Sequence, residues 1–264
     1  MPRTIVVTGA SSGVGLAAAE QFAAQGDHVV LVGRNPDRLA AAVQRVGHGA
    51  DSYRADFERL DEVRALAAYL RDRYETIDVL ANNAGGMVGE RRITVDGFEA
   101  TIQGNFLAPY VLTGLLRDRL AGGRVVNTAS DAHRGSPLDP EDFTASSRKF
   151  NRWAAYGGAK AADILFTAEA ATRWPELFSV CFHPGVVRTN FGEGALTRFF
   201  FKYAPLLITP ERAGARLVHL AGAPASDLLN GGYYVDGKLA KPSRPANDPT
   251  TAARLWDAAA KAVG

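Results

Sequence analysis

A tyrosine and a lysine lie four positions apart in the segment Tyr156-Gly157-Gly158-Ala159-Lys160. In a helix this spacing places both side chains on one face, one turn apart. A tyrosine with its ordinary pKa of about 10 is a poor acid or base at neutral pH, and a neighbouring cation favours the ionised phenolate. The pair predicts proton transfer by Tyr156 assisted by Lys160, although an isolated pair of this type is more often an ordinary contact on a helix surface.

A glycine-rich turn near the start of the chain could bind an anion. Thr4–Thr8 has the apolar character of a buried parallel strand, and Gly9-Ala10-Ser11-Ser12-Gly13-Val14-Gly15 leads from it into a helical pattern over residues 16–25. Glycines let the backbone turn sharply and approach a pyrophosphate, and the free N–H groups at a helix start attract negative charge. The Gly-x-x-x-Gly-x-Gly spacing departs from the Gly-x-Gly-x-x-Gly fingerprint but still predicts a dinucleotide site.

Taken with Tyr156 and Lys160, this turn resembles that of the short-chain dehydrogenase/reductase family. Asn105, in a helical stretch over residues 96–119, matches the helix asparagine of the family, and Ser130, at the end of an apolar strand from residue 125, matches its catalytic serine. Two further segments match family motifs in the same order along the chain: Asn82-Asn83-Ala84-Gly85, after the apolar strand 77–81, and His183-Pro184-Gly185-Val186-Val187-Arg188-Thr189, after the strand 178–182.

The resemblance implies an NAD(P)-dependent enzyme that interconverts a carbonyl and an alcohol. Ser130 would bind the substrate oxygen and Tyr156 would transfer the proton, while Lys160 would lower the pKa of Tyr156 and hold the nicotinamide ribose. Asn105 would hold a water in the proton relay. The implied cofactor-binding residues are Gly9, Ser11, Ser12, Gly13, Val14, Gly15, Arg34, Asp56, Phe57, Asn83, Ala84, Gly85, Tyr156, Lys160, Pro184, Gly185, Val187 and Thr189.

The choice of cofactor depends on the residue after the second strand, residues 28–32. An acidic residue there would bind the adenosine ribose hydroxyls, but this chain has Gly33-Arg34. Arg34 could clamp a 2′-phosphate, so we expect NADP(H) rather than NAD(H). Alternatively, Arg34 only caps the helix that starts near Asn35-Pro36. Asp56, after the strand 52–55, resembles the adenine-contacting aspartate of the family, and an N-cap role for the helix near residues 58–73 is equally compatible.

The distance of 26 positions between Ser130 and Tyr156 is longer than is usual in the family. This insert, with Ala132-His133, Ala155-Tyr156, the segment 164–167 and Leu255-Trp256, resembles the retinol dehydrogenase-like and WW-domain oxidoreductase-like branch. The branch implies a lipophilic alcohol or carbonyl as substrate. His133 could face that substrate, but a histidine satisfied by the backbone is the favoured interpretation.

Composition and element order predict one α/β domain over residues 1–264. The chain is 47% apolar and alternates strand-like with helix-like segments, which favours a doubly wound parallel sheet with helices on both faces. The resemblance implies a Rossmann-type sheet of about seven strands in the order 3-2-1-4-5-6-7, completed by a strand at 232–236 and a helix at 249–263. Helices carrying Asn105 and Tyr156 form the dimer interface in many relatives, which allows a homodimer.

Several classes of function lack support in the sequence. A formal net charge of +2 without a basic stripe argues against nucleic-acid binding, and no residues have metal-ligand spacing. The single cysteine, Cys181, is most simply a core residue. The first strand begins by Thr4, which leaves no room before it for a signal peptide or membrane anchor, so we expect a cytoplasmic protein.

An aromatic segment follows Thr189 where the family places its substrate lid, here about residues 186–210. It contains Phe191 and Phe199-Phe200-Phe201, and it is too short and interrupted to span a bilayer. Residues 199–208 could form a lid that accepts a lipophilic substrate, a helix packed on the core, or a transient contact with a membrane surface.

Two other classes of protein must be compared with the enzyme. A non-catalytic NADP(H)-binding sensor or scaffold could keep the same fold, since fold does not determine function. Such proteins commonly lose a catalytic position, whereas this chain keeps Asn105, Ser130, Tyr156 and Lys160. A nucleotide-sugar epimerase also uses Tyr-x-x-x-Lys, but its glycine turn is spaced differently and its C-terminal domain is larger.

Overall fold

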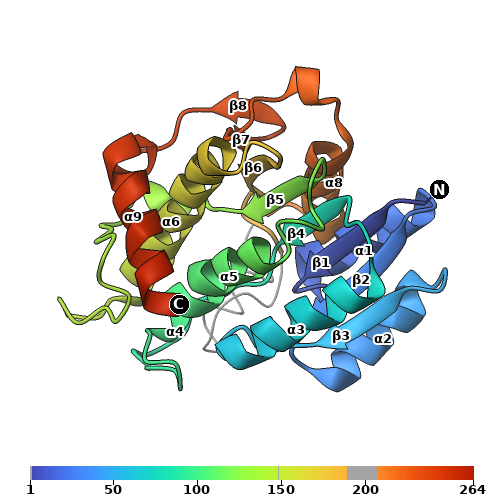
Figure 1. Ribbon diagram of the computed structural model, residues 1–264, viewed down its shortest axis with the longest axis horizontal. Helices are drawn as coiled ribbons and strands as arrows, with labels where there is room; N and C mark the ends of the chain where they lie inside the picture. Colours follow the sequence, from blue (N-terminus) through green and yellow to red (C-terminus); the bar gives the residue numbers. More distant parts are fainter. Residues whose placement is uncertain (1, 148, 189–206) are drawn as a thin grey trace.

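The apolar segments of the sequence form one eight-stranded sheet in the computed structural model, which describes residues 2–147, 149–188 and 207–264 (Figure 1). The spatial order is β3-β2-β1-β4-β5-β6-β7-β8, so the predicted order is confirmed and one strand is added to it. All neighbouring strands are parallel except β8, which is antiparallel to β7. The strands are β1 Thr4–Thr8, β2 His28–Gly33, β3 Asp51–Arg54, β4 Val79–Asn82, β5 Arg124–Thr128, β6 Phe178–His183, β7 Tyr233–Val235 and β8 Lys238–Ala240.

Helices cover both faces of this sheet (Figure 1). The helices α1, α2 and α8 share one hydrophobic core with the sheet, and α3, α5, α6 and α9 share the other. The α-helices are α1 Gly13–Ala24, α2 Pro36–Val46, α3 Leu60–Arg73, α4 Ala100–Ile102, α5 Ala108–Leu115, α6 Arg152–Arg173, α8 Pro210–Gly222 and α9 Pro249–Val263. A π-helix, η1 Gln103–Leu107, and three 3-10 helices, η2 Asp131–Gly135, η3 Ala225–Asp227 and η4 Pro245–Asn247, complete the regular structure of the described residues.

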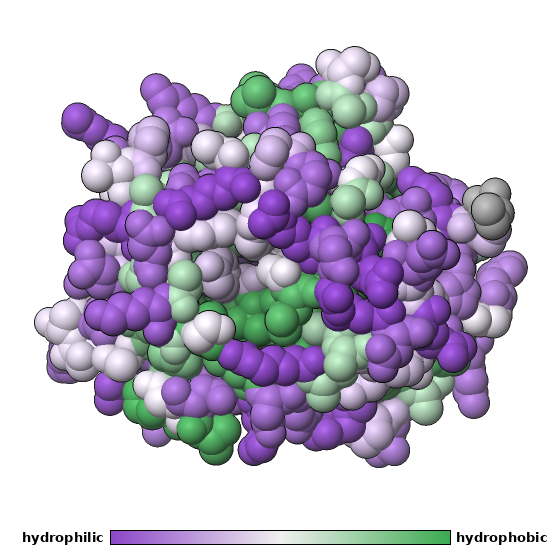
Figure 2. Space-filling view, in the orientation of Figure 1, coloured by the Kyte–Doolittle hydropathy of each residue, from purple (hydrophilic) through white to green (hydrophobic). Residues whose placement is uncertain are grey.

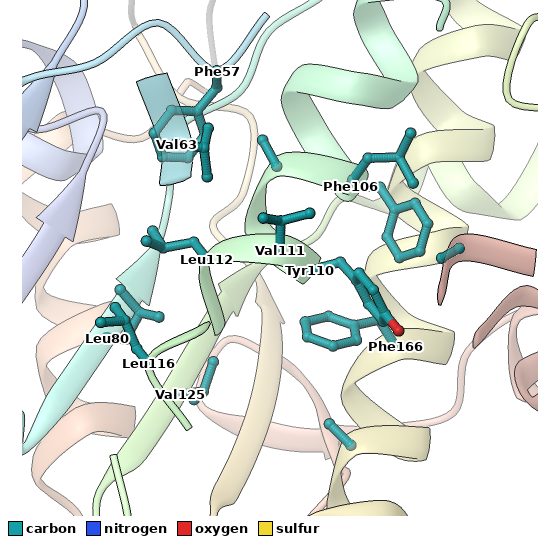
Figure 3. Close-up of a cluster of buried hydrophobic side chains, with 14 of the residues drawn as sticks. Phe57, Val63, Leu80, Phe106, Tyr110, Val111, Leu112, Leu116, Val125 and Phe166 are labelled. Atoms are coloured by element: carbon teal, nitrogen blue, oxygen red, sulfur yellow. The ribbon is translucent and has the colours of Figure 1, made fainter. Parts of the chain in front are cut away.

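Alternating side chains of the central strands fill the two cores. On β1, Ile5 and Val7 pack with α1 and α8, whereas Val6 points to the other face. This follows from the two-residue period of a strand, and Ile5, Val6 and Val7 are all apolar because both faces of the sheet are covered. Figure 3 shows part of the second core, where Leu80 and Val125 of the sheet meet the α5 residues Val111 and Leu112.

The helical stretch predicted over residues 96–119 is interrupted, which corrects the prediction of one continuous helix. Helix starts only at Ala100, because the buried carboxylate of Glu99 caps α4 by accepting from the Ile102 amide at 3.1 Å. The chain then forms the π-helix η1 before it continues as α5. Pro109 lacks an N–H, so the carbonyl of Asn105 cannot receive an ordinary α-helical hydrogen bond. Such π-turns occur frequently at functional sites.

The C-terminal helix α9 packs against α6. Its Trp256 ring lies 5.2 Å from the Tyr110 ring of α5 and 5.9 Å from the Phe166 ring of α6. Figure 2 shows the face of the molecule that Figure 1 presents to the viewer. This face is mostly hydrophilic, with hydrophobic residues near its centre over α5. Part of the surface that sequence reasoning offered for a homodimer is therefore covered by the chain's own last helix.

Candidate active site

The predicted site residues surround one cleft at the carboxyl ends of the parallel strands. The cleft has a volume of about 1010 Å³ and is lined by residues that follow β1, β2, β4, β5 and β6. Ligands of open parallel sheets bind at this edge. Of the predicted catalytic and cofactor-binding residues that the structure describes, only Gly15 does not line the cleft. Thr189, Phe191, Phe199–Phe201 and most of the predicted lid lie outside the described residues.

The glycine turn brings the start of α1 against the loop that follows β4. Gly9 and Gly13 have positive φ angles of 67° and 57°, which side chains rarely adopt. A Cβ atom at Gly15 would lie 2.5 Å from the Gly9 carbonyl oxygen and 2.6 Å from Asn83 Nδ2. Gly15 therefore serves close packing behind the cleft, while Gly13 and Val14, whose N–H groups have no partner within the helix, line the cleft at the start of α1.

Tyr156 and Ser130 meet where α6 passes η2. Asn151 starts α6 by accepting hydrogen bonds from the amides of Trp153 and Ala154. A Cβ at Gly157 would lie 2.4 Å from the Ala132 carbonyl oxygen, so this glycine allows η2 to approach the helix closely. Ser130 Oγ accepts a hydrogen bond from the Ala132 amide at 3.2 Å and also hydrogen-bonds Tyr156, which lowers the phenol's pKa.

The net acidity of Tyr156 differs from the expectation based on spacing. Burial is the largest influence and raises the pKa of Tyr156 above its ordinary value. The charge of Lys160 and the hydrogen bond with Ser130 lower it, but they do not offset the loss of solvent. Tyr156 is therefore protonated at neutral pH in the protein without ligands.

Lys160 is held by two hydrogen bonds from α6 into the site. Its Nζ donates to the Thr128 carbonyl at the end of β5, at 2.8 Å, and to Asp163 Oδ2 at 2.9 Å. Sequence reasoning missed Asp163, although its position three residues after Lys160 places it on the same helix face. An ammonium has three N–H donors, so one is left for a ligand in the cleft.

The amide of Asn105 stabilises the π-helix. Nδ2 donates to the carbonyls of Thr101 at 2.7 Å and Gly86 at 2.8 Å, and Oδ1 accepts from the Gly86 amide at 3.1 Å. The bond to Thr101 satisfies a carbonyl four residues earlier, in the turn where the helix widens. The side chain thus joins η1 to the loop after β4, and a Cβ at Gly85 would lie 2.4 Å from its Oδ1.

Two arginines stand at the cleft beyond β2. Arg34 Nη1 lies 3.3 Å from Glu58 Oε1 and 3.9 Å from Asp56 Oδ1, and its side chain is 60% exposed. Arg38, which sequence reasoning missed, lines the same region from the first turn of α2. The capping role considered for Arg34 is wrong, because Asn35 caps α2 by accepting from the Arg38 amide. The N-cap role for Asp56 is also wrong, since it accepts from the Glu58 amide and α3 begins only at Leu60.

His133 is satisfied by the backbone, as the favoured interpretation predicted. Its Nδ1 lies 2.6 Å from the Ser130 carbonyl oxygen and Nε2 accepts from the Ser243 amide at 3.0 Å, which identifies the neutral ring with its proton on Nδ1. The alternative that His133 faces the substrate is wrong, because it is buried and does not line the cleft. His183 does line the cleft, and its Nδ1 accepts from the Asp131 amide at 3.3 Å.

Within residues 2–147, 149–188 and 207–264, no group of three His, Cys, Asp or Glu side chains could hold a metal ion. Over the same residues, no helix has both the length and the apolar composition needed to cross a bilayer. Cys181 is buried in β6, as expected for a core residue.

Comparisons with known proteins identify the family. The short chain dehydrogenase family model matches residues 3–197. A protein assigned as a daunorubicin C-13 ketoreductase in Streptomyces sp. strain C5 is 48% identical over 266 residues, covering 99% of this chain and 93% of the relative. Human retinol dehydrogenase 13 is 32% identical over 280 residues, covering 99% of this chain and 85% of its own.

A solved structure supports the same assignment. The crystal structure of an uncharacterised protein from Mycobacterium paratuberculosis superposes with a TM-score of 0.82 at 30% identity, covering 98% of this chain and 92% of that one. The retinol dehydrogenases among the relatives confirm the branch predicted from the insert and the C-terminal residues. The chain belongs to the short-chain dehydrogenase family, in its retinol dehydrogenase-like branch, and is an oxidoreductase.

Proposed function

We propose that this oxidoreductase uses NADP(H) to reduce the carbonyl group of a lipophilic small molecule through Tyr156, Ser130, Lys160 and Asn105. The observation that carries the proposal is that these four residues and the two arginines beyond β2 line a single cleft. The similarity to a ketoreductase and to retinol dehydrogenases agrees with a carbonyl or alcohol on a lipophilic molecule.

The cleft fits a dinucleotide in three respects. In the glycine turn, Gly9 and Gly13 line the cleft and carry no side chain, so the backbone there can approach a pyrophosphate closely. Lys160 keeps one N–H for a ribose hydroxyl, and the guanidinium groups of Arg34 and Arg38 could pair with a 2′-phosphate. When bound, the reduced nicotinamide would supply a hydride to the substrate carbon.

The protein's own residues would handle the proton. Ser130 and Tyr156 would donate hydrogen bonds to the substrate oxygen, and Tyr156 would then transfer its proton as negative charge develops there. Lys160 would stabilise the resulting phenolate. Because burial keeps Tyr156 protonated at neutral pH, the ligand-free protein already holds the proton that carbonyl reduction requires.

A water relay would use the backbone of Asn105 rather than its amide. The amide already makes three hydrogen bonds within the protein. The Asn105 carbonyl, which cannot bond to Pro109, could accept a hydrogen bond from a water that returns a proton to Tyr156.

An apolar wall supports a lipophilic substrate. Met87, Val88 and Val186 line the cleft together with Trp153, whose side chain is 46% exposed. Trp153 lies three residues before Tyr156, so its indole is one helical turn from the proton donor. An indole at the mouth of a cleft can stack on a planar substrate.

The proposal is tested by NADPH oxidation with a panel of aliphatic, retinoid-like and polycyclic aromatic aldehydes and ketones, with NADP-linked alcohol oxidation in parallel. We expect turnover of a lipophilic carbonyl by the wild type and none by Tyr156→Phe, with NADPH binding retained by the variant. Tight NADPH binding without turnover of any carbonyl or alcohol would favour the non-catalytic sensor instead.

A further inference from the structure

Asp163 continues the line of functional side chains along α6. Tyr156, Lys160 and Asp163 are four and three residues apart, so all three share one face of the helix. Lys160 and Asp163 are only 4% and 3% exposed, and Nζ lies 2.9 Å from Oδ2. The two charges therefore form a buried ion pair directly behind the cleft, which Lys160 lines and Asp163 does not.

The surroundings of Lys160 supply no second carboxylate in ion-pair contact among the described residues. From β5 it meets the Thr128 carbonyl, which is neutral, and from the loop after β4 it approaches Gly85. The titratable groups that face it are Tyr156 and Asp163 on α6 and Cys181 on β6. Burial raises the pKa of the Cys181 thiol far above its usual range, so Cys181 contributes no charge at neutral pH.

A lone ammonium in such a site would lose its proton at a lower pH than usual, because desolvation penalises the charged form. We propose that Asp163 is the counter-ion of Lys160, a positioning residue that keeps the ammonium charged and directs its remaining N–H toward the cleft. This inference rests on the proposed function of Lys160, but the state of the lysine can be measured without turnover.

The pKa values of the pair agree with this role. Although burial lowers the pKa of Lys160, the charge of Asp163 and, where Tyr156 is ionised, the charge of its phenolate raise the Lys160 pKa above its ordinary value. Burial raises the pKa of Asp163 to about 6 despite the opposing effect of Lys160. The pair is therefore ionised at neutral pH, and Asp163 loses its charge below about pH 6.

The test uses protein labelled with ¹⁵N at its six lysines, with the Lys160 signal assigned by its loss in Lys160→Met. In Asp163→Asn, which keeps the shape of the side chain but not its charge, we expect the pKa of Lys160 to fall by about 2 units or more. The alkaline limb of the kcat/KM profile for NADPH-dependent reduction should move to lower pH by a similar amount. Glu99→Gln, which removes another buried carboxylate that forms no ion pair with Lys160, should change neither.

A Lys160 signal that titrates identically in Asp163→Asn and wild type would overturn the proposal. The wild type alone gives a second test if the variant does not fold. In the wild type the charge of Asp163 should hold the pKa of Lys160 at or above its ordinary value despite burial, and a Lys160 signal that titrates well below that value would also refute the pairing. Failure of the proposed function would instead appear as a wild type without turnover, whatever the lysine titration shows.

Discussion

Removing the Arg34 side chain should lower the kcat/KM for NADPH but not that for NADH, with little effect on folding. In the protein its guanidinium pairs with Glu58 and approaches Asp56, with the side chain 60% exposed. Ion pairs this exposed contribute about 0–1 kcal/mol to stability. Arg34→Ala should therefore fold with a nearly unchanged Tm.

The loss of NADPH affinity can be estimated from the same contacts. A hydrogen bond between a guanidinium and a phosphate is worth about 1.5–3 kcal/mol. Release of Arg34 from Glu58 would cost up to about 1 kcal/mol of this gain. The net effect is about 0.5–3 kcal/mol, or about a 2- to 150-fold loss in kcat/KM for NADPH. NADH lacks the phosphate, so its kcat/KM should change by less than about twofold.

The assay compares kcat/KM for NADPH and NADH with one carbonyl substrate. Arg45→Ala is the matched control, because Arg45 is an exposed arginine of α2 that pairs with Glu20 and does not line the cleft. Glu58→Gln should instead raise the kcat/KM for NADPH, because it removes the carboxylate that pairs with Arg34 and so frees Arg34 for the phosphate. Equal losses for both cofactors in Arg34→Ala, or a wild type that prefers NADH, would refute the assignment of Arg34 to the 2′-phosphate.

Three further outcomes follow from the site and its packing. Trp153→Ala should raise the KM for polycyclic aromatic carbonyls about 5-fold or more, because about 1 kcal/mol of stacking is lost. The KM for NADPH should not change, and equal changes in both KM values would contradict a stacking role. Gly15→Ala should destabilise the fold by about 1–3 kcal/mol in urea unfolding, whereas Gly135→Ala, where an added Cβ meets nothing within 4 Å, should not. Burial lowers the pKa of His133 and His183, so as the pH decreases below about 6.5 the unfolded chain binds more protons at these two side chains and stability should decrease, an effect that the raised pKa of Asp163 opposes only in part and below about pH 6. Melting temperatures measured between pH 8 and 5.5 check this, and an unchanged Tm would contradict it.

Much of the fold follows from local patterns in the sequence. The bounds of β1 and α9 agree with the residues expected, because an apolar run and the Asp248-Pro249 helix start mark them clearly. The strand β8 was missed although Asp236-Gly237 is a hairpin signal, and both residues have the positive φ angles that such a turn requires. The interruption around Asn105 was missed because helical periodicity does not distinguish an α-helix from a π-turn.

Sequence spacing also predicted the main residues of the candidate site better than the side chains that accompany them there. Tyr156 and Lys160 are neighbours on one helix, so their proximity could be predicted from four-residue spacing alone. Asp163 also follows helical spacing from Lys160, and Arg38 lies in the first turn of α2, but nothing in the sequence states which helix face meets the cleft. That information comes from the packing of α2 and α6 on opposite faces of the sheet.

The acidity of the phenol is the clearest case in which packing reverses an argument from spacing. A cation one turn away favours the phenolate, but the same packing that brings Lys160 close removes Tyr156 from water and brings Asp163 beside the lysine. Burial acts on the phenolate directly, whereas the lysine acts on it with a charge that is shared with a carboxylate. The protonated phenol is the form that donates to a developing alkoxide, so the balance between phenol and phenolate suits carbonyl reduction at neutral pH. A variant without Asp163 should shift this balance toward the phenolate for as long as Lys160 stays charged.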